Sequence, residues 1–154
     1  MKNDEATTRI RQALREAGLR ITAPRLTVLA MLEEMPHSTA DALLERVRGT
    51  LGTLSRQGIY DVLSSLEEAG LVRRIEPAGH ASHYETRVGD NHHHVVCREC
   101  GAIADVDCAV GAMPCLEPSS TSGFTVEEAE INFWGLCPDC QERTQSPLTE
   151  ARSE

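Results

Sequence analysis

The chain has 154 residues, enough for one medium domain or two small ones, and a formal net charge of −9. Residues 1–80 carry 11 basic and 11 acidic side chains, whereas residues 81–154 carry 4 and 13, so the neutral first half leaves nucleic-acid binding open. The chain has neither an apolar run of about 18 residues nor an N-terminal secretory signal, which excludes a transmembrane helix and predicts a cytoplasmic protein with no membrane partner.

The first half of the chain carries four amphipathic helical patterns, in which apolar residues recur three and four positions apart. The inward residues are Ile10, Ala13, Leu14 and Ala17 in the first, Val28, Met31, Leu32 and Met35 in the second, Ala40, Leu43, Leu44 and Val47 in the third, and Ile59, Val62, Leu63 and Leu66 in the fourth. The predicted boundaries are Gly18 at the end of the first helix, Pro24 at the start of the second, Ser38 and Gly49 around the third, and Ser55 and Gly70 around the fourth.

A β-hairpin is predicted after the fourth helix. The β-prone residues 71–75 and 82–85 flank a turn at residues 77–79. Helices followed by a two-stranded wing are typical of a winged helix-turn-helix, in which the helix before the wing enters the DNA major groove. Arginine and glutamine on that helix can pair bidentately with base edges, although an ordinary solvated face is the alternative. The outward residues are Arg56, Gln57, Tyr60, Asp61 and Ser64.

The second half of the chain is predicted to be a small domain of short strands. Strands are expected at residues 95–96, 102–106 and 124–134, and a segment at 113–123 that contains Pro, Ser and Gly separates the last two. The sequence thus predicts an α+β fold class. Its expected parts are a winged helix-turn-helix DNA-binding domain at residues 1–86, a hinge linker at 87–91, a metal-binding domain at 92–142 and a flexible tail at 143–154.

Two Cys-x-x-Cys pairs carry the clearest chemistry. Cys97 and Cys100 form one pair and Cys137 and Cys140 the other, and each pair places two thiolates on one turn. Four thiolates make a tetrahedral cage for Zn²⁺. In a reducing cytosol, the six cysteines indicate metal binding or redox sensing instead of structural disulfides. We therefore predict a structural zinc in the second domain, with a redox dithiol pair and an iron–sulfur cluster as the alternatives.

Three consecutive histidines precede the first cysteine pair. In an extended segment, His92 and His94 project from one face and His93 from the other. Imidazoles with nearby carboxylates and no thiolate suit Fe²⁺, Mn²⁺, Zn²⁺ or Ni²⁺. The residues therefore indicate a second metal site without choosing its metal, and a solvated loop is the alternative.

Together these features resemble the ferric uptake regulator family over about residues 10–140. The cysteine spacing, the His-x-His sequence before the first cysteine pair and the preceding wing carry the resemblance. The matching segments are Leu19–Arg25, Ile59–Tyr60, Ala69–Val72, His92–Gly101 and Phe133–Cys137. The tract from Gly89 to Cys115 resembles the actinobacterial branch of the family that represses catalase-peroxidase.

The resemblance implies a homodimeric repressor that binds a palindromic operator in double-stranded DNA when a regulatory metal is bound. The second domain would then be an α/β dimerisation domain. Fe²⁺ is the expected regulatory metal, with Mn²⁺ or Zn²⁺ as substitutes. The implied ligands are His37, Glu85, His92, His94 and Asp105. The expected DNA-binding residues are Arg20, Arg25, Ser55, Arg56, Gln57 and Tyr60.

Asp105 favours peroxide sensing within this family. The chain resembles the peroxide-sensing branch in having aspartate there, whereas glutamate is commoner in iron-uptake repressors. In such sensors Fe²⁺ reacts with peroxide and ligand histidines are oxidised, and His37 and His92 match those targets. Glu85 departs from the pattern, because the best-known peroxide sensors have aspartate at its position. Regulation of zinc, nickel or iron uptake is the alternative.

Other positions lead to negative or open expectations. Asn91 and Ala129 stand where the family often has ligands of a third metal site, which we therefore expect to be absent. Cys108 and Cys115 lie outside the two cysteine pairs and could form a regulatory disulfide, with two partly buried small residues as the alternative. We expect no enzyme: a zinc hydrolase needs an open metal position and a general base, and a four-cysteine site has no such position.

Overall fold

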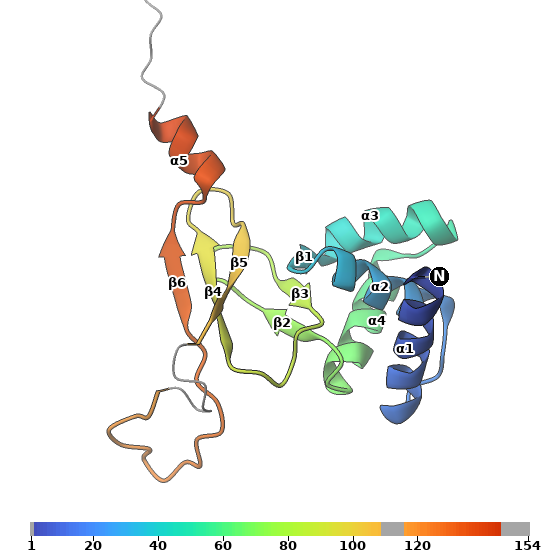
Figure 1. Ribbon diagram of the computed structural model, residues 1–154, viewed down its shortest axis with the longest axis horizontal. Coiled ribbons are helices and arrows are strands. Elements are labelled where there is room, and N and C mark those ends of the chain that lie inside the picture. Colours follow the sequence, from blue (N-terminus) through green and yellow to red (C-terminus); the bar gives the residue numbers. More distant parts are fainter. Residues whose placement is uncertain (1, 109–115, 146–154) are drawn as a thin grey trace, which may run out of the picture. The chain divides into compact units, whose positions relative to one another are not determined.

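The computed structural model describes residues 2–108 and 116–145 (Figure 1). The chain divides into two compact units, Met1–Asp90 and Asn91–Glu154. Helices and a small sheet make up the first unit, and a second sheet followed by a short helix makes up the second. None of the described helices is both long and apolar enough to cross a membrane. The hinge role of residues 87–91 stays a prediction.

The first unit is built from amphipathic helices that share one aliphatic core. Its helices are α1 (Lys2–Glu16), α2 (Ala23–Glu34), α3 (Ala40–Leu51) and α4 (Arg56–Glu68). All four predicted apolar stripes contribute to this core, and Tyr84 is its only aromatic member among the described residues. Each fully buried leucine or valine contributes about 1.5–3 kcal/mol. The fully buried aliphatic side chains of this core are Leu14, Val28, Leu32, Leu43, Val47, Ile59, Leu63 and Leu66.

Hydroxyl side chains cap the helices of this unit. Ser55 caps α4, as the sequence predicts, because its Oγ accepts a hydrogen bond from the backbone N–H of Gly58 at 2.9 Å. Thr22 caps α2 in the same way through the N–H of Arg25 at 3.4 Å, and a proline follows in the first turn. The orientation of both helix starts is therefore fixed by local contacts.

The third helix differs from its prediction at both ends. Thr39 and not Ser38 is its N-cap, because Thr39 Oγ1 accepts a hydrogen bond from the backbone N–H of Ala42 at 3.2 Å, whereas Ser38 Oγ donates to Met35 O at 2.7 Å. The helix also continues past Gly49 to Leu51, and Gly52 follows with φ 82°, a conformation that suits glycine. In these two additional helical residues, Leu51 is partly buried against the core.

A three-stranded antiparallel sheet completes the first unit. Its strands are β1 (Ser38–Thr39), β2 (Arg73–Ile75) and β3 (His83–Glu85), in the order β1-β3-β2. Strands β2 and β3 form the predicted wing, with Arg74 opposite Tyr84. The two-residue strand β1 was not predicted, because it is too short to carry a pattern. It pairs Ser38 with Tyr84 and so joins the end of α2 to the wing.

The second unit is a sheet with β4 at its centre. Its elements are β4 (His92–Cys97), β5 (Ile103–Asp107), β6 (Asn132–Gly135) and α5 (Pro138–Gln145), and the strand order is β5-β4-β6. Strand β4 is antiparallel to β5 and parallel to β6. The α+β fold class, with a helical first domain and an α/β second domain, is thus confirmed.

Two predicted boundaries in this unit are wrong. The last strand begins at Asn132 and not at Phe124, because its pairing with β4 starts there and Phe124 is 77% exposed. The tail predicted from residue 143 is helical up to Gln145, since α5 starts with Pro138 at a favourable position and continues past the second cysteine pair. The rest of the predicted tail lies outside the described residues.

Candidate metal centres and nucleic-acid interface

The four cysteines of the two pairs converge in the second unit. The parallel pairing of β4 with β6 places Cys97 opposite Gly135, and this pairing brings the two Cys-x-x-Cys turns together. All four sulfurs lie within 4.8 Å of one another, and the sulfurs of Cys100 and Cys137 are 3.6 Å apart. In a tetrahedral zinc site with Zn–S distances of about 2.3 Å, the sulfurs are about 3.8 Å apart. The cluster of Cys97, Cys100, Cys137 and Cys140 therefore suits a structural zinc.

The thiols of this cluster ionise differently. The backbone N–H of Cys100, followed by that of Cys137, lowers the pKa of the Cys97 thiol to about 6. Burial raises the pKa of the Cys140 thiol to about 12. Because zinc binds thiolates, its binding must displace a proton from Cys140 at neutral pH, whereas Cys97 is already largely ionised.

A residue that the sequence analysis missed contacts this cluster. Arg143 Nη2 donates a hydrogen bond to Cys140 Sγ at 2.7 Å. The signal available in the sequence was the spacing, since a basic residue three positions after a ligand in a helix lies on the same side of that helix. Proline at the first position of α5 could have indicated the helix itself.

Three of the predicted regulatory ligands lie together in the second unit. His92 and His94 project from one face of β4, as predicted, and their ring centroids are 4.9 Å apart. Asp105 stands opposite His94 on β5, with Oδ1 3.7 Å from His92 Nε2 and 3.6 Å from His94 Nε2. Two ligands of one ion at about 2.1 Å are about 3.0–3.4 Å apart, so small movements would place all three around a metal. Both histidines are buried.

The other two predicted ligands lie together in the first unit. His37 Nε2 is 3.0 Å from Glu85 Oε2, and Glu85 is fully buried. His37 follows α2 and has φ 61°, a left-handed conformation that costs a non-glycine residue about 1–2 kcal/mol. Strain of this kind is concentrated at functional sites. A buried carboxylate beside an imidazole offers two of the ligand types that first-row divalent metals prefer.

The predicted disulfide between Cys108 and Cys115 is not tested by the described residues. Cys108 follows β5 and is half-buried, and its backbone N–H donates to Asn91 O at 3.3 Å. Cys115 lies outside the described residues. The regulatory disulfide and the absence of a third metal site therefore stay predictions.

The outward face of α4 is exposed as the sequence predicts. Arg56, Gln57 and Tyr60 are exposed, while Ile59 and Leu63 are buried on the opposite face. Arg56 forms an exposed ion pair with Asp41 at 3.3 Å, and Gln57 donates to Asp61 at 2.7 Å. These contacts are between solvated side chains and are easily exchanged for contacts with a ligand.

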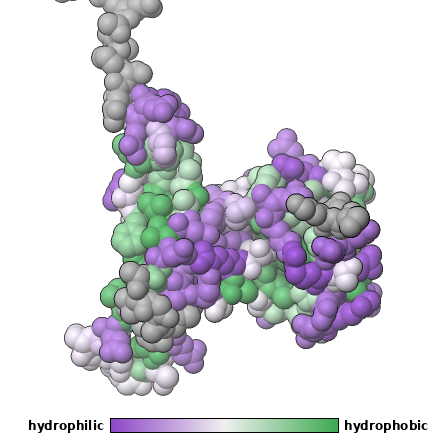
Figure 2. All heavy atoms as spheres, in the orientation of Figure 1, coloured by the Kyte–Doolittle hydropathy of each residue, from purple (hydrophilic) through white to green (hydrophobic). Residues whose placement is uncertain are grey.

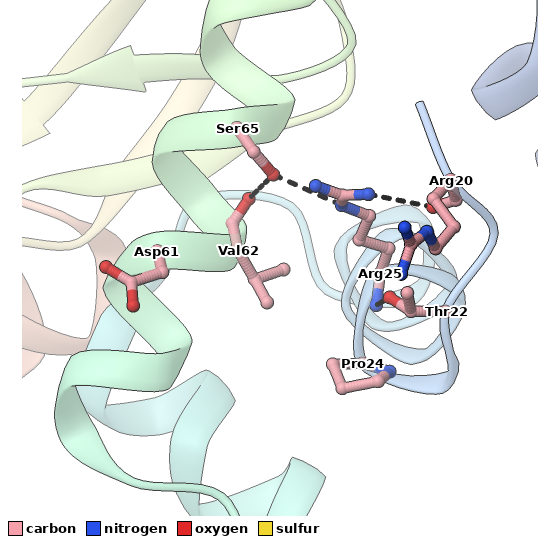
Figure 3. Close-up of a pocket in the computed structure, with 7 residues that line it drawn as sticks. All are labelled: Arg20, Thr22, Pro24, Arg25, Asp61, Val62 and Ser65. Carbon is pink, nitrogen blue, oxygen red and sulfur yellow. Dashed lines mark hydrogen bonds between the residues drawn. The ribbon is translucent and has the colours of Figure 1, made fainter. Parts of the chain in front are cut away.

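A hollow of about 660 Å³ lies between the start of α2 and α4 (Figure 3). The predicted DNA-binding residue Arg25 crosses it: Nη1 donates to Arg20 O at 2.8 Å, and Nε donates to Ser65 Oγ at 3.3 Å. The side chain of Arg20 is exposed at the same place. Two guanidinium groups and one carboxylate, that of Asp61, line this hollow, so its charged side chains carry a net positive charge that suits an anionic ligand.

A helical domain with a wing, followed by a sheet domain with a four-cysteine cluster and histidine–carboxylate groups, defines a metal-responsive transcriptional regulator. The chain belongs to the ferric uptake regulator family, whose sequence profile matches residues 16–134. Membership of this family makes it a regulator and not an enzyme.

Individual relatives support this assignment. The chain is 55% identical over 129 residues to the transcriptional regulator FurA of Mycobacterium tuberculosis. This match covers 84% of this chain and 88% of the relative. It is 58% identical over 121 residues to ferric uptake regulation protein 1 of Mycolicibacterium fortuitum, covering 79% and 75%. Among solved structures, the Vibrio cholerae ferric uptake regulator matches with a TM-score of 0.65 and 29% identity, over 82% of this chain and 98% of that one.

Proposed function

We propose that this chain is a cytoplasmic, homodimeric repressor that binds a palindromic DNA operator when a regulatory metal is bound, and that peroxide acting through bound Fe²⁺ relieves repression. We further propose that it controls oxidative-stress defence, such as catalase-peroxidase, because the tract from Gly89 to Cys115 resembles the branch of the family that represses catalase-peroxidase. The observation that carries the proposal is the presence of two incomplete ligand groups, one in each unit: His37 with Glu85, and His92 and His94 with Asp105.

One regulatory ion would use both groups. Two ligands from the first unit or three from the second leave a five- or six-coordinate ion incomplete, whereas all five together fill most of its positions. An ion that binds the joined arrangement more tightly than the separate units shifts the chain towards that arrangement. In this way metal binding would fix the orientation of the DNA-binding unit.

DNA binding is supported by the first unit. The exposed face of α4 carries Arg56, Gln57 and Tyr60, and the adjacent hollow carries Arg20 and Arg25. We assign base contacts to α4 and a phosphate contact to the hollow, because arginine pairs bidentately with both guanine and phosphate. The related Vibrio cholerae ferric uptake regulator has DNA-binding domains, which supports the same role for the first unit of this chain.

Dimerisation is supported by the second unit. Phe133 on the edge strand β6 is 49% exposed and Leu136 is 40% exposed. Figure 2 shows apolar side chains at the surface over this sheet. Exposed apolar groups on the edge of a sheet favour association with a second copy. Two copies present two recognition helices, which is the reason for a palindromic operator.

The test is DNA binding as a function of metal and peroxide. Genomic fragments selected with the metal-loaded protein are titrated by fluorescence anisotropy with Fe²⁺, Mn²⁺, Zn²⁺ or Ni²⁺, before and after peroxide. We expect metal-dependent binding that is lost after peroxide with Fe²⁺ and kept with Mn²⁺, together with added oxygen on His37 or His92 by mass spectrometry. Binding that responds to Zn²⁺ or Ni²⁺ and is indifferent to peroxide would assign the chain to metal uptake instead.

A further inference from the structure

Cys140, one of the two buried cysteines of the four-cysteine cluster, accepts a hydrogen bond from a side chain. Cys97 Sγ accepts a bond from the backbone N–H of Cys137 at 3.3 Å. Cys140 is only 2% exposed, and the guanidinium of Arg143 donates a hydrogen bond to its sulfur at 2.7 Å. Backbone donors are fixed by the fold, whereas a side-chain donor can be removed by one substitution.

Helix α5 places Arg143 beside the cluster. Cys140 and Arg143 are three residues apart in this helix and therefore lie on the same side of it. A hollow of about 300 Å³ opens at this side of the cluster. Its lining residues are Glu99, Cys100, Cys140, Arg143 and Thr144. Solvent thus reaches the exposed Cys100 on this side and comes next to the buried Cys140, where the guanidinium lies.

The charge of the site explains what such a contact does. Four thiolates with one Zn²⁺ carry a net charge of about −2. A cation that donates a hydrogen bond to one thiolate offsets part of this charge, and charge-assisted bonds are about twice as strong as neutral ones. Partners of metal ligands typically change metal affinity by about 10–100-fold when they are removed.

We propose that Arg143 is a positioning residue of the structural zinc site: it holds the Cys140 thiolate in place and slows zinc loss through the adjacent hollow. The proposal rests on the zinc assignment of the four cysteines. A solvated arginine that only complements the dipole at the end of a helix would leave the metal unaffected.

The experiment uses the full chain loaded with Zn²⁺ or Co²⁺, and four proteins: wild type, Arg143→Met, Arg143→Lys and the control Glu142→Met. The control introduces the same side chain at the exposed neighbouring position of the helix. Zinc transfer to a chromophoric chelator gives the rate of loss. The sulfur-to-cobalt charge-transfer band reports the hydrogen bond itself, because a donor on a thiolate lowers the energy of the sulfur lone pairs.

We expect Arg143→Met to lose zinc about ten-fold faster and to shift the cobalt band to longer wavelength. Arg143→Lys should be intermediate, and Glu142→Met should match wild type. The proposal is overturned if Arg143→Met matches wild type in both measurements, or if Glu142→Met accelerates loss equally. If Arg143→Met does not fold, the sulfur-to-cobalt band of Arg143→Lys is used instead. A shift of this band to longer wavelength supports the proposal, and a band at the wild-type wavelength overturns it.

Neither readout involves DNA or the regulatory metal. The result is therefore independent of whether the regulatory proposal holds. A wild-type chain that does not bind about one zinc through the cysteine cluster would overturn the zinc assignment and the role of Arg143 together.

Discussion

Ser55 has two candidate roles that substitutions can separate. Its hydroxyl caps α4 through the N–H of Gly58, and the sequence also predicts that it contacts DNA. Removing a capping hydroxyl, as in Ser55→Ala, costs about 1 kcal/mol, which changes the ratio of folded to unfolded protein about five-fold. For the first unit, Met1–Asp90, this loss lowers the melting temperature by about 4–8 °C.

The assay is thermal unfolding, followed by circular dichroism, of the zinc-loaded chain with Ser55→Ala, Ser55→Asp or Ser64→Ala. Aspartate is also a good cap, so Ser55→Asp should keep the wild-type melting temperature. Ser64 is exposed on the same helix, and its replacement should change stability by less than about 0.5 kcal/mol. If Ser55 also touches a phosphate, Ser55→Asp is stable but binds DNA weakly. A Ser55→Ala protein as stable as wild type would refute the capping role.

The remaining predictions concern the two kinds of metal centre. Cys137→Ser should lose zinc, measured by plasma emission, and should unfold or monomerise, measured by circular dichroism and light scattering; a zinc-loaded dimer would contradict this. The fold lowers the pKa of the Cys97 thiol to about 6. The thiolate therefore stabilises the folded chain above this pH, and this stabilisation is lost when Cys97 is protonated as the pH falls through about 6. The number of protons released on zinc binding is measured by calorimetry in buffers of different ionisation enthalpy. About one more proton per zinc should be released at about pH 5 than at about pH 7.5. An equal number at both pH values would contradict the lowered pKa of Cys97. His92→Ala should weaken Mn²⁺ binding at least ten-fold with zinc retained. His93→Asn, on the other face of β4, should leave Mn²⁺ binding unchanged. If both substitutions weaken Mn²⁺ binding equally, the prediction that only the face of His92 and His94 binds the metal is wrong.

Local signals in the sequence were sufficient for much of the first unit. The cap at Ser55, the apolar face of α4 and the wing all depend on residues a few positions apart, and they were predicted at the correct places. The end of α3 was not, because Gly49 and Gly52 are equally plausible stops locally. The burial of Leu51 against the core decides between them, and that contact is not local.

The candidate site was predictable to different degrees. The alternation of a strand indicated that His92 and His94 share a face, and cysteine spacing indicated the four-cysteine cluster. The parallel pairing of β4 with β6, which joins the cysteine pairs, is a contact between distant segments that spacing does not reveal. His37 could be named only through the family resemblance, because its left-handed backbone and its contact with Glu85 leave no mark in the residues around it.

The most direct test of the account is the number of regulatory ions per chain. Zinc-loaded protein is titrated with Mn²⁺, and bound ions are counted by electron paramagnetic resonance in wild type, His37→Ala and Asp105→Asn. The account predicts about one ion in wild type and almost none in either variant at the same free Mn²⁺, because ligands from both units hold one ion. Retention of about one ion by each variant would show that the two groups bind separately, and would contradict a metal that joins the units.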